Sequence, residues 1–88
     1  MFQRPDQPER LIEKIQAGDE QLRNQFIAES VPEIKHWVRR ITHSFFAERE
    51  DEFSIALEGF NQAINHYSHH SQVPFYSYAY LVIKNRLL

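Results

Sequence analysis

The amino-acid sequence predicts an all-α fold, a compact domain of four to five helices. Apolar residues recur at three- and four-residue spacing rather than alternating, which is the pattern of amphipathic helices. Only two glycines occur in 88 residues, so few positions favour a turn. With 42% hydrophobic and 25% charged residues the composition is globular, and a chain of this length supports one core.

The first half of the chain predicts two helices with recognisable ends. Pro8 suits the first turn of a helix that ends at Gly18, and Asp19 then caps the next helix. At Val31-Pro32 we expect a kink, or a break followed by a restart, because proline lacks an amide donor and restricts the residue before it. Beyond Pro32 one helical face gathers the apolar side chains Ile34, Trp37, Val38, Ile41 and Phe45.

The second half predicts two further helices. After a loop at 46–50, a helix from about Asp51 to His66 carries apolar residues within about 40° of one line on a helical wheel, namely Phe53, Leu57, Phe60, Ile64 and Tyr67. The polar stretch 68–74 ends in proline and is predicted to be a loop. The last helix begins at Phe75 and turns inward Phe75, Ala79, Val82 and Ile83. Because the sequence ends on Leu87-Leu88 without a stop signal, we expect more chain to follow.

Composition excludes several classes of protein. The absence of cysteine excludes a disulfide scaffold, a thiolate zinc site and a cysteine nucleophile. No apolar run approaches twenty residues, so we expect a cytoplasmic protein without a membrane partner. The net charge of -2 means that any contact with nucleic acid must be local or shared with a partner. Without a glycine-rich phosphate loop, a nucleophile elbow or paired carboxylates, we expect neither an enzyme nor a cofactor.

The helix predicted at 51–66 carries a candidate protein-binding face. Ile55 points about 200° away from Phe53 and shares its side of the helix with Asp51, Glu58 and Gln62. A single exposed isoleucine is ordinary on any protein surface. Its acidic neighbours favour the alternative, a binding face for a basic partner.

The segment 75–80 holds four aromatic residues, which cannot all face one core. Exposed rings beside Lys84 and Arg86, in a helix without acidic residues, suit unpaired bases, because rings stack on bases and cations hold the backbone. The alternative is that Phe75 and Tyr76 belong to the core while the other tyrosines cover its rim.

Three histidines near the predicted loop raise the question of a metal. His66 and His70 have the four-residue spacing that places two imidazoles on one helical face. The helix is expected to end between them and no third ligand is evident, so we predict no metal site. A small metal or ligand sensor built on His66, His69 and His70 remains an alternative.

From Asp51 onward the sequence resembles region 2 of sigma-70-family RNA polymerase sigma factors. That region has an acidic start, a Gly-x-x-x-Ala helix, a loop and a Phe-Ser-Thr-Tyr-Ala-like aromatic box in fixed order. The counterparts here are Asp51, Gly59, Ala63, the loop ending at Pro74, and the box at 75–79. The run 11–19 is similar to the usual entry into this domain, and the segments 51–57 and 82–84 resemble the sigma-I subfamily.

The resemblance implies two binding surfaces. One would dock on the clamp helices of the largest subunit of core RNA polymerase and consists of Asp51, Glu52, Ser54, Ile55 and Glu58. The other would capture single-stranded promoter DNA, the nontemplate bases of the minus-ten element, and consists of Tyr76, Ser77, Tyr78, Tyr80, Leu81 and Lys84. Tyr78 would be the stacking ring, and Lys84 would lie near the phosphates.

The resemblance also implies limits and partners. Residues 1–88 would form the region 2 domain of a longer alternative factor whose C-terminal promoter-reading domain is absent, and an anti-sigma factor would sequester it. Leu81 and Val82 replace the paired tryptophans of housekeeping factors, and the loop 68–74 lacks the Asp-Pro and glycine of the family. We therefore expect a different choice of bases. A helical protein-interaction adaptor that never touches DNA is the competing hypothesis.

Overall fold

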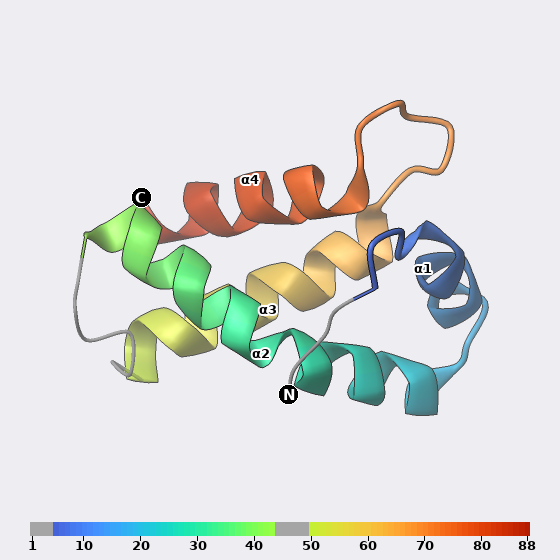
Figure 1. Cartoon of the computed structure of the whole chain (residues 1–88), viewed down its shortest axis with the longest axis horizontal. Coiled ribbons are helices and arrows are strands. Elements are labelled where there is room, and N and C mark those ends of the chain that lie inside the picture. Colours follow the sequence, from blue (N-terminus) through green and yellow to red (C-terminus); the bar gives the residue numbers. More distant parts are fainter. Residues whose placement is uncertain (1–4, 44–49) are drawn as a thin grey trace.

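Four α-helices make up the regular structure of residues 5–43 and 50–88 (Figure 1). The computed structural model describes residues 5–43 and 50–88. Its elements, in order, are α1 (Glu9–Gln16), α2 (Glu20–Thr42), α3 (Glu50–His66) and α4 (Phe75–Leu87). No strand occurs among the described residues, and the predicted all-α class is confirmed with four helices.

The junction between α1 and α2 takes only a few residues. Gly18 adopts a φ of +117°, and its amide donates to the carbonyl of Ile15 (2.9 Å), while the amide of Asp19 donates to that of Lys14 (3.2 Å). These two bonds satisfy carbonyls at the end of α1 in a Schellman motif. The Asp19 carboxylate accepts from the amide of Leu22 (3.0 Å) and so caps α2. The predicted stop and cap are both confirmed.

Helix α2 runs without interruption through Pro32. Proline has no amide to donate to the carbonyl four residues earlier, so one helical hydrogen bond is missing there. Figure 1 shows the axis of α2 changing direction near its middle, as a proline kink would produce. The alternative expectation, a break and restart, is wrong. Phe26 before the proline and Ile34 after it are buried in the same core, which holds the two halves together.

The apolar face of α2 beyond the kink is confirmed. Ile34, Trp37, Val38 and Ile41 are all buried. The last residue predicted for this face, Phe45, lies outside the described part of the chain, as does the predicted loop up to residue 49. Residue 50, placed in that loop, is already the first residue of α3.

Small residues let α3 and α4 approach closely. Ala56 and Ala63 are fully buried, and a methyl group added to Gly59 would lie 3.2 Å from side-chain carbons of both Ile83 and Arg86 on α4. The buried face of α3 is therefore centred on Ala56, Gly59 and Ala63, and not on the line of large apolar residues that the sequence predicted. Phe60, Ile64 and Tyr67 are buried as predicted, whereas Phe53 and Leu57 are only half-buried against the core.

The predicted loop at 68–74 and the start of α4 at Phe75 are confirmed. Phe75, Ala79 and Ile83 are fully buried, while Val82, also expected inside, is half-buried. In the core, the Phe75 ring lies edge-on to Phe60, with 5.7 Å between ring centroids. Figure 1 shows α1 and the loop 68–74 together at one end of the molecule. None of the helices described combines the length and the apolarity that a membrane crossing requires.

Candidate functional site

The outer face of α4 is uncharged apart from a cation. Ser77 and Lys84 are exposed and the Leu81 side chain is 54% exposed. These three residues fall within about 60° of one another on a helical wheel, flanked by half-buried Tyr78 and Tyr80. Because α4 contains no acidic residue, nothing on this helix would repel a phosphate.

A groove of about 450 Å³ lies between α2 and α4 and is lined by Glu33, Trp37, Arg40, Tyr76, Ser77 and Tyr80. Three of these six residues are aromatic, and Glu33 and Arg40 add one acidic and one basic side chain. The Trp37 ring is perpendicular to that of Tyr80, with centroids 5.6 Å apart, and meets Tyr76 edge-on at 6.5 Å. A groove of this size accommodates a ligand as large as a nucleobase, and Arg40 supplies a cation beside the rings.

Sequence reasoning missed the α2 side of this groove. From the sequence, Trp37 was assigned only to the apolar face of α2, and Arg40 was given no role. Glu33, Trp37 and Arg40 are spaced by four and three residues, so they share one face of the helix. That spacing was visible in the sequence, but only the packing of α4 against α2 makes this face part of a groove.

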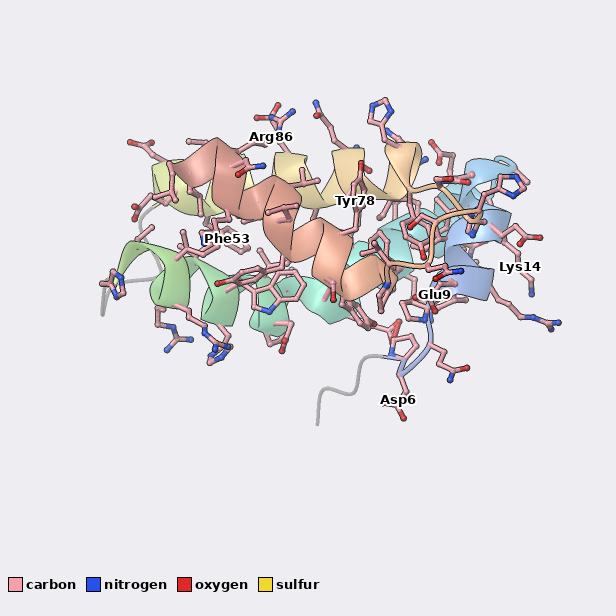
Figure 2. The ribbon with its side chains drawn as sticks, turned by 90° about the horizontal axis from the view of Figure 1, so that it is seen from above. Asp6, Glu9, Lys14, Phe53, Tyr78 and Arg86 are labelled. Atoms are coloured by element: carbon pink, nitrogen blue, oxygen red, sulfur yellow. The ribbon has the colours of Figure 1, made fainter. Side chains whose placement is uncertain are left out.

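The aromatic residues predicted to bind DNA divide between two flanks of α4. Tyr76 and Tyr80 face α2, whereas the Tyr78 ring lies 5.9 Å from that of Tyr67 at the end of α3. Figure 2 shows Tyr78 on the side of α4 toward α3. The Tyr76 hydroxyl donates to the carbonyl of Pro5 (2.7 Å). All three rings are half-buried, so the alternative that Phe75 and Tyr76 are core residues holds in full only for Phe75.

The loop 68–74 is held by its own hydrogen bonds. The Tyr67 hydroxyl donates to the carbonyl of Val73 (2.7 Å), and the Ser71 hydroxyl accepts from the amide of Val73 (2.9 Å). The hydroxyl of Ser68 accepts from the amide of His70 (3.3 Å). Burial, with the carboxylate of Glu9 as a smaller cause, raises the pKa of Tyr67, so its hydroxyl remains a donor to a more alkaline pH than an exposed tyrosine would.

Most residues predicted to form a protein-binding face lie on the outer face of α3. Asp51, Ser54, Glu58 and Gln62 are exposed, and the Ile55 side chain, 36% exposed, lies among them. The face thus carries two carboxylates and a single apolar residue.

Two residues connect this face of α3 with its surroundings. Glu52, predicted to belong to the face, is half-buried and lies about 60° from Ile55 on the wheel, on the side where Gly59 meets α4. The guanidinium of Arg86 on α4 donates to the side-chain oxygen of Gln62 (Figure 2). The cation that the sequence placed beside the aromatic box therefore reaches toward α3, and Lys84 is the cation on the outer face.

The histidines near the loop have separate surroundings. His66 is the last residue of α3, so the helix ends before His70 as expected. The Nε2 atom of His69 lies 3.1 Å from the side-chain oxygen of Gln16, and its ring meets the Tyr67 ring edge-on at 5.1 Å. Within the ranges 5–43 and 50–88, no three potential metal-ligating side chains lie together.

Comparison with known proteins gives one consistent group of relatives. The chain is 40% identical over 78 residues to the RNA polymerase sigma factor SigI3 of Acetivibrio thermocellus, a match that covers 88% of this chain and 31% of the relative. It is 40% identical to SigI2 of the same organism, and 35% identical over 80 residues to SigI of Bacillus subtilis. These matches cover 88% and 91% of this chain but 29% and 32% of the relatives. No family model matches the chain.

The chain thus spans about a third of the length of these relatives. The matches cover about nine tenths of its residues. The resemblance predicted from the acidic helix and the aromatic box is confirmed: the chain is related to the sigma-I subfamily of RNA polymerase sigma factors, within the sigma-70 family.

Proposed function

We propose that this chain is the region 2 domain of an alternative sigma factor. It binds core RNA polymerase through the outer face of α3 and captures unpaired nontemplate bases of the minus-ten promoter element with α4 and the loop before it. The observation that carries the proposal is the acid-free outer face of α4 beside the aromatic groove that it forms with α2. The names of the relatives support the same role.

The proposed DNA surface has the physical properties that single strands require. Stacking on an aromatic ring is worth about 1 to 3 kcal/mol per base, which offsets the few kcal/mol needed to unstack that base. Melted DNA would therefore be captured without ATP hydrolysis, by binding alone and not by catalysis. The proposed base-binding residues are Tyr76, Ser77, Tyr78, Tyr80 and Leu81, with Lys84 and Arg40 close to the phosphates.

The proposed polymerase surface uses a different helix. Asp51, Ser54, Ile55 and Glu58 are displayed together on α3, and their acidic character suits a basic partner such as the clamp helices of the largest subunit. Glu52 would contribute from the edge of this surface. Because the two surfaces lie on different helices, one protein could bind polymerase and DNA at the same time.

Binding to polymerase is tested by reversing one charge on α3. Asp51→Arg should abolish capture of the chain by core RNA polymerase in a pull-down, because the acidic face then carries a cation toward a basic partner. Glu29→Arg, the same change at an exposed position of α2, is the matched control and should leave capture unchanged. Equal capture of both variants would contradict the docking surface.

Binding to DNA is tested on Tyr78. Tyr78→Ala should weaken binding of a nontemplate minus-ten oligonucleotide by about tenfold, as expected for the loss of one stacked base. Tyr78→Phe keeps the ring and should bind like the parent chain. The adaptor hypothesis predicts that the parent chain does not bind the oligonucleotide even at low salt. That result would exclude the DNA-binding role.

Two further parts of the proposal follow from this role. The chain would act in the cytoplasm, where the polymerase is. An anti-sigma factor that controls it would act by covering either the outer face of α3 or the outer face of α4, and competition with polymerase or with oligonucleotide would distinguish the two.

A further inference from the structure

We infer that α1 positions the base-binding surface, with Glu9 and Gln16 as the positioning residues that hold the two ends of the loop 68–74. This inference rests on the proposed function, because it concerns the loop and helix that would meet the single strand. Neither residue belongs to the surfaces described above, and each acts through the backbone at one end of the loop.

Glu9 holds the end of the loop that leads into α4. The residue before α4, Pro74, has no side chain that can accept a hydrogen bond, so the first amides of the helix lack a local cap. A carboxylate oxygen of Glu9 accepts from the amide of Phe75 at 2.9 Å. Figure 2 shows Glu9 beside the start of α4. A distant residue therefore supplies the cap, and its negative charge lies at the favourable end of the helix dipole.

Gln16 holds the end of the loop that leaves α3. Its side-chain nitrogen donates to the carbonyls of Ile64 (2.8 Å) and Tyr67 (3.0 Å), which lie at the C-terminal end of α3. Carbonyls in the last turn of a helix have no partner within the helix, so this amide satisfies two of them at once. Its side-chain oxygen lies 3.1 Å from Nε2 of His69, inside the loop.

The spacing of the two residues makes α1 a single rigid connector. Positions 9 and 16 are seven residues apart, two turns of a helix, and so share one side of α1. Ile12 and Ile15 between them are buried in the core, which fixes α1 to the rest of the molecule. The hydrogen bond from Tyr76 to the carbonyl of Pro5 joins the same N-terminal segment to the first turn of α4.

A loop that is already held binds a flexible strand at a lower entropic cost than a loop that must become ordered on binding. Loss of either positioning residue should therefore weaken capture of single strands without affecting the outer face of α3. For Glu9, the direction of the change in DNA affinity distinguishes positioning from a simple charge effect. Removing a carboxylate near a DNA-binding helix would by charge alone strengthen binding to a polyanion, whereas the loss of positioning weakens it.

The test compares isosteric and truncating variants of the full chain. Glu9→Ala removes the acceptor, while Glu9→Gln keeps an oxygen that can accept from the Phe75 amide and should rescue binding. Gln16→Glu keeps the shape but loses both donors. Exposed positions supply controls with the same charge changes, Glu13→Ala on α1 and Gln21→Glu on α2.

Three measurements are made below the unfolding temperature of every variant: affinity for a short AT-rich single-stranded oligonucleotide, affinity for core RNA polymerase, and amide hydrogen exchange of residues 68–75. Glu9→Ala and Gln16→Glu should bind the oligonucleotide about tenfold more weakly than their controls. Exchange at the ends of the loop should be faster, and polymerase affinity should be unchanged. Glu9→Gln keeps the acceptor and loses the charge, so it should bind the oligonucleotide at least as tightly as the parent chain.

Several results would overturn the inference. Oligonucleotide affinity equal to that of the controls would show that the loop needs no support from α1. An equal loss of affinity for core RNA polymerase would mean that both residues only stabilise the fold. If the parent chain itself does not bind the oligonucleotide, the proposed function fails first and this inference fails with it.

Discussion

Arg39 and Arg40 form a matched pair that tests the groove between α2 and α4. Both are exposed, and both lie in the last turn of α2, but only Arg40 lines the groove. Substituting glutamine for either removes the same charge from nearly the same place. We expect Arg40→Gln to weaken binding of single-stranded DNA and Arg39→Gln to leave it almost unchanged.

The expected magnitude follows from the position of each cation. Each substitution loses a similar interaction with the helix dipole, about 0.3 to 1 kcal/mol, so the two variants should be equally stable. A charge-assisted hydrogen bond from Arg40 to a phosphate would add about 1.5 to 3 kcal/mol. Its loss corresponds to an affinity about ten to a hundred times weaker. Each lost phosphate contact should also lower the salt slope by about 0.7.

The assay is fluorescence anisotropy with a labelled nontemplate oligonucleotide over a series of salt concentrations. The Arg40→Gln variant should show both the weaker affinity and the smaller salt slope. Equal losses for the two variants would mean that the cations act only through long-range attraction, and no loss in either would mean that the strand does not enter the groove.

Substitutions at three further positions test the fold around the site. Gly59→Leu adds a side chain where even a methyl group would lie 3.2 Å from Ile83, and should lower the free energy of unfolding in urea by about 1 to 3 kcal/mol; an unchanged midpoint would contradict the close packing of α3 and α4. Asp19→Ala removes the cap of α2 and should cost about 1 kcal/mol in the same assay, whereas Asp19→Asn should cost less. Tyr67→Phe addresses pH: because burial raises the pKa of Tyr67, the parent chain should lose stability as the pH rises above about 10, and the variant should lose less. Identical stability profiles of parent and variant at alkaline pH would refute that assignment.

Local signals in the sequence predicted the helices well. Gly18, Asp19 and Pro74 each act within a few residues of themselves, so the ends that they mark could be identified without knowledge of the fold. Pro32 shows the limit of such signals. Whether a proline kinks or breaks a helix depends on the packing of both halves, and here the core on either side of it keeps α2 continuous.

The site was predictable on one helix at a time. The outward positions of α4 and α3 follow from helical periodicity, which needs only the sequence of each segment. The contacts of Glu9 with Phe75 and of Gln16 with Tyr67 join residues that are 66 and 51 positions apart in sequence. Helical periodicity within one segment cannot predict such contacts. The groove likewise depends on how α2 and α4 cross, so only the assembled fold brings Trp37 and Arg40 beside Tyr80.

The junction at Gly18 and Asp19 restricts where this domain can change in length. The amide of Asp19 donates to the last turn of α1, and its carboxylate caps α2. An inserted residue would prevent one residue from making both hydrogen bonds. Deletion of Gly18 would remove the residue whose positive φ ends α1. A change of length between Ser68 and Pro74 would likewise displace the carbonyl of Val73 from the hydroxyl of Tyr67.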